Sequence, residues 1–173
     1  APGVTKAITS FGAYDVTESS VPGYTQTSAS ADCAGTIALG QNKTCTITND
    51  DVAPSLTLNK IVVNDNGGSA AESAWMLTAD GGAAGTLSGP GAAGAADVVS
   101  GASFDAGTYA LSESAGPAGY SPSAWSCVKN GAAPVVGASI VMAVGDTAVC
   151  SITNDDVAGT IIVRVGGEQG AAL

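Results

Sequence analysis

Short segments in which apolar and polar residues alternate follow one another along the chain, separated by turns rich in Gly, Pro and Asn. The clearest segment, 55–63, is β-branched and ends at the turn sequence Asn64-Asp65-Asn66-Gly67-Gly68, which predicts a strand. No segment keeps a helical period over three turns, so the chain is predicted to be all-β. Further strands are predicted over 74–79, 106–113, 124–129, 139–144 and 148–154, with a Gly- and Ala-rich loop over 81–96 that holds one short strand.

An internal repeat orders these strands. The segment from Cys45 to Ala53 returns, with one change, from Cys150 to Ala158, which is 105 residues later. A unit of about 105 residues has the size of one immunoglobulin-like sandwich, and tandem units of this kind build rods and stalks. The landmarks upstream keep the same order: Gly12-Ala-Tyr14 through Glu18 returns as Gly107-Thr-Tyr109 through Glu113, and Pro22-Gly-Tyr24 returns as Ala118-Gly-Tyr120.

The repeat predicts tandem immunoglobulin-like β-sandwich units, one complete and one partial. Residues 1–52 match only the second half of the unit, and residues 53–157 make up the complete one. Residues 158–173 supply a first strand that belongs to a following repeat or is donated to the next subunit. A half-sandwich alone would keep an open edge and an uncovered apolar face, which favours association. The candidate interface strand consists of Thr160, Ile161, Ile162, Val163, Arg164 and Val165.

Composition narrows the function. Gly, Ala, Ser and Thr replace the Leu, Glu and Lys of helical proteins, which favours a β-rich chain. The 15 Asp and Glu outnumber the 5 Lys and Arg, and no basic run occurs, so nucleic acid is excluded as a partner. No apolar run reaches the roughly 18 residues of a membrane helix, which argues against membrane insertion. Without a His, a phosphate loop or an exposed-nucleophile motif, we expect no cofactor and no enzymatic action on another molecule.

Four cysteines fall into two close pairs, Cys33 with Cys45 and Cys127 with Cys150. Their spacing lacks the C-x-x-C of metal knuckles and redox motifs, and no His is present to complete a zinc site, so no metal is expected. Disulfides within each pair are therefore favoured over free thiols. They imply an oxidising, extracellular location at the cell surface.

Five landmarks together resemble bacterial surface-protein repeats of prealbumin-like (transthyretin-like) fold, such as the B-type domains of collagen adhesins and the pilin-type domains of Gram-positive pili. The resemblance covers essentially the whole chain and implies a sandwich that serves as a spacer or shaft. The landmarks are Leu56 to Gly68, Gly107 to Glu113, Gly119-Tyr120, Trp125-Ser-Cys127 and Cys150 to Asn154.

The same resemblance implies an intramolecular isopeptide bond, for which Lys60, Glu113 and Asn154 occupy the matching positions. Such a bond requires burial, because an amine in an apolar site loses its proton and becomes nucleophilic, while a carboxyl there gains one. The protonated carboxyl polarises the Asn carboxamide, which the amine attacks with release of ammonia. The alternative is that Lys60 lies on a solvated strand face, Glu113 meets solvent or Lys60 as an ion, and Asn154 starts a turn with Asp155 and Asp156.

The two incomplete parts of the chain lack a full set of these residues. Glu18 and Asn49 take the corresponding places in the N-terminal half, where the lysine would lie before residue 1. Arg164 aligns with Lys60 after one gap, and a guanidinium is not a nucleophile at ordinary pH. A unit completed by the C-terminal strand is therefore expected to lack the bond.

Other motifs have ordinary explanations beside the functional ones. Asn42-Lys43-Thr44 is a glycosylation sequon, and a chance match is an equal explanation. Asn64 to Gly67 resembles part of a calcium loop but lacks the expected Glu, which favours a turn. Asp50-Asp51 and Asp155-Asp156 fit a hard cation or simple solvation of a linker. Tyr24, Tyr120 and Trp125 fit a sugar-stacking surface, although a Trp beside a disulfide is more often a core residue.

The sequence therefore predicts a structural subunit of an extracellular filament or surface appendage, which assembles head to tail with copies of itself, by β-strand addition at an incomplete sandwich. The second interpretation is a stalk or ligand-binding repeat of a long tandem cell-surface adhesin, of which these residues are a segment. Its ligand would be a glycan or protein of a host or another surface. The only catalysis expected is single-turnover, autocatalytic isopeptide formation.

Overall fold

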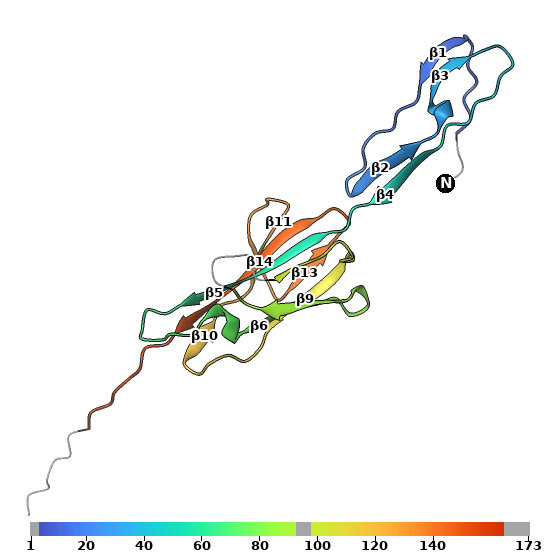
Figure 1. The fold of residues 1–173 in the computed structure, drawn as a ribbon. Helices are drawn as coiled ribbons and strands as arrows, with labels where there is room; N and C mark the ends of the chain where they lie inside the picture. The colour runs from blue at the N-terminus through green and yellow to red at the C-terminus, as the bar shows by residue number, and fades with distance from the viewer. Residues whose placement is uncertain (1–3, 93–97, 165–173) are drawn as a thin grey trace, which may run out of the picture.

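The computed structural model describes residues 4–92 and 98–164. Its regular elements are strands and three short 3-10 turns, η1 (Ala31–Cys33), η2 (Glu72–Ala74) and η3 (Gly82–Ala84), which confirms the all-β prediction for the described residues. The strands form an elongated molecule, with an N-terminal pair of hairpin-like sheets at one end, a sandwich in the middle and an extended C-terminal segment at the other end (Figure 1).

The sandwich contains two sheets that face each other across one core. The six-stranded sheet has the order β12-β11-β14-β5-β8, with β10 paired to β14, and the four-stranded sheet has the order β13-β9-β6-β7. The strands of the first sheet are β5 (Ser55–Val63), β8 (Val98–Val99), β10 (Tyr120–Pro122), β11 (Ser126–Lys129), β12 (Val135–Val136) and β14 (Thr147–Asp156). Those of the second are β6 (Met76–Asp80), β7 (Thr86–Pro90), β9 (Gly107–Glu113) and β13 (Ser139–Met142).

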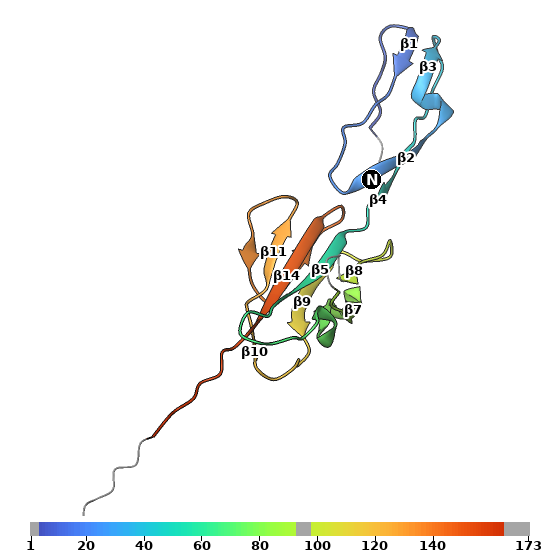
Figure 2. The ribbon, with the colours of Figure 1, turned by 60° about the vertical axis from the view of Figure 1, so that its left-hand side comes forward.

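The first and last strands of the sandwich, β5 and β14, lie side by side in parallel (Figure 2). Their register runs from Ser55 opposite Thr147 to Val63 opposite Asp155. Parallel neighbours need a long crossover between them, and here the other strands of the sandwich provide it. Because side chains alternate along a strand, every second residue of β5 and of β14 faces the core. Since β5 begins the sandwich and β14 ends it, the pairing of these two strands joins the two ends of the sandwich.

The core consists of apolar residues from both sheets. Tyr109 is completely buried, and the single proton of its hydroxyl is shared between the carbonyls of Asp105 (2.7 Å) and Ala84 (3.1 Å). The ring therefore fills the core without leaving an unsatisfied polar group. The buried cluster comprises Leu56, Leu58, Leu77, Ala79, Val98, Tyr109, Leu111, Trp125, Cys127, Ile140, Met142, Ala148, Cys150 and Ile152.

The N-terminal unit, defined here as residues 4–52, has a different organisation. It forms two separate two-stranded antiparallel sheets, β1 with β3 and β2 with β4. Cys33 is its one buried residue among those described. Strand β4 pairs with β2 along one edge, and within the described residues no strand pairs with its other edge. The bounds are β1 (Gly12–Asp15), β2 (Tyr24–Ala29), β3 (Ala34–Ile37) and β4 (Ile47–Asp51).

Most predicted strands are present, with shifted ends. The strand predicted over 55–63 is β5 without change, whereas the one predicted from 74 begins only at Met76, because η2 occupies residues 72–74. The loop over 81–96 contains β7, as predicted, although residues 93–97 lie outside those described. Strands β8, β10 and β12 were not predicted, since two or three residues are too short to show alternation.

Candidate functional site

Lys60 and Glu113 meet inside the sandwich. Lys60 lies on β5 and Glu113 ends β9, so their contact joins the two sheets. The Lys60 Nζ atom is 2.9 Å from Glu113 Oε2, and the two side chains are 0% and 12% exposed. On β5 the lysine takes the next inward position after Leu56 and Leu58. Lys60 is therefore buried, and the expectation of a solvated strand face for it is wrong. Its ion pair with Glu113 agrees with the other part of that alternative, in which Glu113 meets Lys60 as an ion.

Asn154 belongs to the same region. It lies on β14, opposite Val62, while Ile152 of the same strand lies opposite Lys60. Since β14 alternates, Asn154 faces inward with Ile152, and only 2% of it is exposed. Its Oδ1 atom is buried without a hydrogen-bond partner within the described residues. An unsatisfied buried acceptor usually costs about 1–3 kcal/mol, so this oxygen requires an explanation.

Trp75 forms the wall of this site, and the sequence did not identify it. Its ring is 2% exposed and its centroid is 4.8 Å from Lys60 Nζ, which is a cation–π distance. Tyr120 packs against the ring edge-on, with centroids 5.3 Å apart. A side chain at Gly116 would collide with the Trp75 indole, so this position requires glycine. The tryptophan precedes β6 directly, and no motif in the sequence sets it apart.

The N-terminal unit brings together the counterparts of two of these residues. Asn49 Nδ2 donates a hydrogen bond to Glu18 Oε2 at 3.1 Å. Both side chains are exposed, and with Tyr24 they line one shallow pocket. The repeated sequence thus reproduces the Glu and Asn pairing but not its burial.

Both predicted disulfides are present. Cys127 and Cys150 lie opposite each other on β11 and β14 and join these strands, and Cys150 is completely buried. Cys33 and Cys45 join the end of η1 to the segment before β4. Trp125 is 5% exposed and belongs to the same buried cluster as Cys127 and Cys150. This confirms its core role and rules out a sugar-stacking surface that includes it.

Asp156 fixes the turn after β5. Its carboxylate accepts hydrogen bonds from the backbone N–H groups of Asp65 (2.9 Å), Asn66 (3.0 Å) and Gly68. Burial opposes its ionisation, but these donors outweigh that effect and lower the pKa of Asp156. The carboxylates of Asp65, Asp155 and Asp156 lie within 4.8 Å of one another. Backbone donors thus occupy the Asp156 carboxylate, and the chain bends at Asn66 and Gly67, within the segment predicted to turn.

The remaining predicted residues lie at the surface. Asn42 of the sequon is exposed, and its glycosylation stays a prediction. The C-terminal segment has no assigned strand over 157–164, and its apolar residues Ile161 and Val163 are 90% and 80% exposed. Val165 lies outside the described residues. No helix in the described part of the chain has the length and apolar character required to span a bilayer.

These features define the class of the protein: a two-sheet β-sandwich whose first and last strands pair in parallel around a buried Lys and Glu contact. The chain belongs to the family of prealbumin-like fold domains, whose model matches residues 51–152, more than half of its length. The predicted resemblance to repeats of this fold is thereby confirmed.

Two further comparisons add little to this assignment. No curated protein matches the sequence. Among solved structures, the chain is similar to the major pilin protein (T3.2) from Streptococcus pyogenes serotype GAS13637, with 13% identity, 86% of this chain and 69% of that chain covered, and a TM-score of 0.44. A likeness at this level carries no argument, so the assignment rests on the family match.

Proposed function

We propose that the chain is a structural subunit of an extracellular filament or surface appendage, built from tandem prealbumin-like sandwiches and assembled head to tail. The observation that carries this proposal is the unequal pairing of two strands with nearly the same sequence. Strand β14 has β5 beside it, whereas β4, which repeats the second half of β14, has no strand on the corresponding edge among the described residues. An open edge of this kind is a template for another chain.

The C-terminal segment is suited to fill that edge. It follows β14 as the segment leading to β5 follows β4, and Arg164 aligns with Lys60. Ile161, Ile162 and Val163 are 90%, 77% and 80% exposed, and burying one such side chain stabilises an interface by roughly 1.5–3 kcal/mol. In the proposed assembly this segment of one copy lies parallel to β4 of the next copy. The contact is heterologous and therefore continues into a filament.

Association tests this step directly. Replacing Ile162 with Asp places a charge on the inward side of the proposed donated strand, since Ile162 matches the buried Leu58 in the frame that aligns Arg164 with Lys60 after one gap. Sedimentation velocity should show oligomers of the unchanged protein and monomers of Ile162→Asp. Val135→Asp is the control, because Val135 is 69% exposed on β12, which pairs with β11 at the edge of the six-stranded sheet and belongs to neither proposed partner strand. Oligomers of Ile162→Asp equal to those of the control would contradict strand addition.

Within the sandwich we propose that Lys60 and Asn154 form an isopeptide bond with the help of Glu113. Proton transfer from Lys60 to Glu113, 2.9 Å away, gives a neutral amine and a protonated carboxyl without changing the net charge. The amine attacks Cγ of Asn154, a C–N bond forms, and the Asn154 amide nitrogen leaves as ammonia with protons relayed by Glu113. The buried Asn154 Oδ1, for which residues 4–92 and 98–164 supply no hydrogen-bond partner, supports a role for this carboxamide beyond that of a turn.

Such a bond would join the parallel strands β5 and β14, through which tension on the two ends of the sandwich passes. Intact mass spectrometry after reduction tests it. A mass lower by one ammonia, with a cross-linked peptide that contains Lys60 and Asn154, is the expected result. The unmodified mass would refute the bond and leave the disulfide as the covalent link of the sandwich.

The proposed location is extracellular, because two disulfides persist in an oxidising environment. The copies themselves are the proposed partners. The adhesin stalk differs from this proposal in one observable property: its repeats would follow one another in a single long polypeptide. The mass of the native protein therefore separates the two functions.

A further inference from the structure

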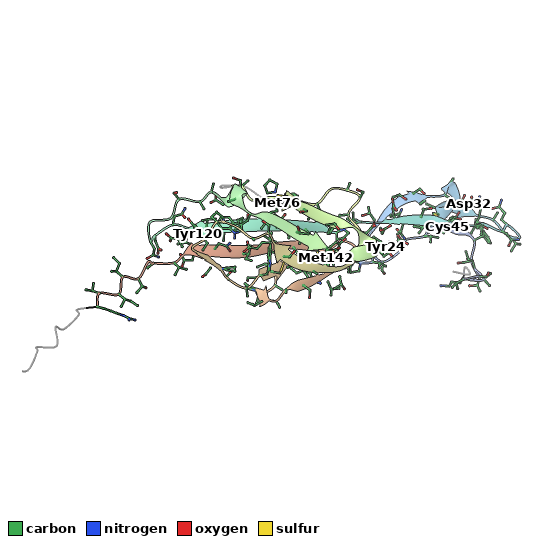
Figure 3. All side chains as sticks on the ribbon, turned by 90° about the horizontal axis from the view of Figure 1, so that it is seen from below. Tyr24, Asp32, Cys45, Met76, Tyr120 and Met142 are labelled. Carbon is green, nitrogen blue, oxygen red and sulfur yellow. A yellow bond between two sulfur atoms is a disulfide. The ribbon has the colours of Figure 1, made fainter. Side chains whose placement is uncertain are left out.

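The N-terminal unit and the sandwich meet at a joint made of two glycines and a valine. Val52 N–H donates to Gly23 O at 2.8 Å, and Gly145 N–H donates to Val52 O at 2.7 Å. A Cβ atom on Gly145 would lie 2.6 Å from the Cα of Gly23, so the two backbones are in direct contact. Figure 3 shows Tyr24, which follows Gly23, in the middle of the molecule, where the N-terminal unit meets the sandwich.

One half of this joint consists of Gly23 and Val52, and we term it the tail. The same arrangement recurs at the far end of the sandwich. Gly119 and Val157 are the repeat counterparts of Gly23 and Val52. Val157 N–H donates to Gly119 O at 2.8 Å, the same bond as in the joint. The φ angle is +81° at Gly23 and +90° at Gly119, so the backbone follows the same course.

The other half is the turn that contains Gly145, and we term it the head. The same arrangement recurs in the turn between β3 and β4. Gly40 lies 105 residues before Gly145, and the two φ angles are +78° and +76°. Both turns are closed by the same hydrogen bond of 3.1 Å, from Gln41 N–H to Ala38 O and from Asp146 N–H to Ala143 O. The chain thus has two tails and two heads.

One tail and one head are joined, and the other two are open. A Cβ atom would meet nothing within 4 Å at Gly119 or at Gly40. Within the described residues, neither Gly40 N–H nor Val157 O has a hydrogen-bond partner, although their counterparts Gly145 and Val52 bond to each other. Leu39 of the open head is 90% exposed, whereas its counterpart in the closed head, Val144, is partly buried.

The open halves lie at opposite ends of the molecule. Figure 3 shows Tyr120, which follows Gly119, at the end with the C-terminal segment, and Cys45, which follows the open head, at the other end. A contact between two different surfaces at opposite ends repeats without closing, provided that its rotation leaves room for the next copy.

We propose that the open tail of one copy, Gly119 and Val157, docks on the open head of a second copy at Gly40. Gly40 N–H then donates to Val157 O, as Gly145 N–H donates to Val52 O within the chain. Ser55 N–H donates to Asp146 O beside the internal joint, at 2.8 Å, and the repeat assigns the same role to Thr160 N–H and Gln41 O. The inference rests on the proposed filament and specifies its subunit contact.

Asparagine substitutions test the joint, because Asn tolerates a positive φ and adds the side chain that the glycine contact excludes. Gly119→Asn blocks the tail and Gly40→Asn blocks the head. Gly131→Asn is the matched control, since Gly131 has a φ of +70° and nothing within 4 Å and belongs to neither open half. Each blocked variant should associate at least about tenfold more weakly in sedimentation equilibrium, and the control should match the unchanged protein.

Mixing the two blocked variants provides a second readout that does not depend on a loss. Gly119→Asn keeps its head and Gly40→Asn keeps its tail, so an equimolar mixture should form dimers with one joint and no longer species. Polymers of both variants equal to those of the control, or a mixture that stays monomeric, would overturn the joint while the filament stands. If the unchanged protein stays monomeric at every concentration, the filament and the joint both fail.

Discussion

The N-terminal unit and the sandwich carry the same sequence landmarks but differ in burial. Tyr109 is completely buried and donates to two carbonyls, whereas its counterpart Tyr14 is half-buried and donates to one, Asp32 O at 3.0 Å. Glu113 pairs with a buried lysine, while Glu18 lies in solvent. The landmarks that both regions share therefore set local pairing but not burial. The burial of these side chains in the sandwich comes from the first half of the repeat unit, which contributes β5 and β6 and has no counterpart in residues 4–52.

Disulfides carry different weight in the two regions. Cys150 belongs to a cluster of buried apolar residues, so its bridge adds to an existing core. Cys33 is the one buried residue described in the N-terminal unit, so its bridge replaces a core. Small units that cannot bury enough apolar surface usually depend on such links.

The largest difference should come from the two glutamates. Glu113→Ala leaves the buried Lys60 without its carboxylate, and removing one partner of a buried pair typically costs about 3–5 kcal/mol. Glu18→Ala removes an exposed side chain and should change the free energy of unfolding by less than about 0.5 kcal/mol. Urea denaturation of both variants measures this. Equal effects would show that the two regions do not differ in burial.

Removal of the disulfides should separate the regions next. Replacing Cys33 and Cys45 with Ser should cost about 2–4 kcal/mol and unfold the N-terminal unit while the sandwich persists. Replacing Cys127 and Cys150 should lower the stability of the sandwich by a similar amount without unfolding it, because its core remains. Two-dimensional NMR spectra distinguish the regions. Loss of dispersed sandwich signals in the first variant would contradict their independence.

Acid should weaken the sandwich through Asp146 but not the corresponding turn of the N-terminal unit. Hydrogen bonds from the Asn130 amide and the Ala143 N–H, together with Lys129, lower the pKa of Asp146 to about 2. Its counterpart Gln41 accepts from Ala38 N–H at 2.9 Å and carries no charge. Because the folded-state pKa lies below the ordinary 3.8, the stabilisation is complete above 3.8 and is lost as the pH falls toward 2.

Urea midpoints at pH 6, 4 and 2.5 test whether the stabilisation by Asp146 is lost as the pH falls. Asp146→Asn should be less stable than the unchanged protein at pH 6, and the gap should shrink toward pH 2.5. Gln41→Asn, which changes the matching turn without a charge, should show a gap that does not vary with pH. A constant gap for Asp146→Asn would contradict the account.

The smallest expected effect is that of salt on association. Each copy carries a formal charge of −10, so copies repel one another at low ionic strength. Raising NaCl from about 0.01 to 0.15 M shortens the screening length from about 30 to 8 Å and should strengthen association by a few fold. Weaker association at higher salt would indicate a contact held by opposite charges instead of by backbone and apolar groups.

The sequence predicted the strands in which apolar and polar residues alternate. It also predicted which face of the strand is occupied by the residues that continue this alternation. Lys60 follows Leu56 and Leu58 at every second position, which places it inward once β5 is recognised. Other features depend on residues far apart in the chain and have no local signal. Asp156 bonds to backbone groups near residue 66, and Trp75 packs on Lys60 across the site. The C-terminal segment, as a strand, requires a partner that the described residues do not supply.

Electron microscopy of the purified protein over a range of concentrations tests head-to-tail assembly most directly. The account predicts thin fibres with a constant axial repeat, which shorten and disappear on dilution or with Ile162→Asp, and whose building block has the mass of a single chain. Monomers at all concentrations, or fibres made of one much longer polypeptide, would contradict it.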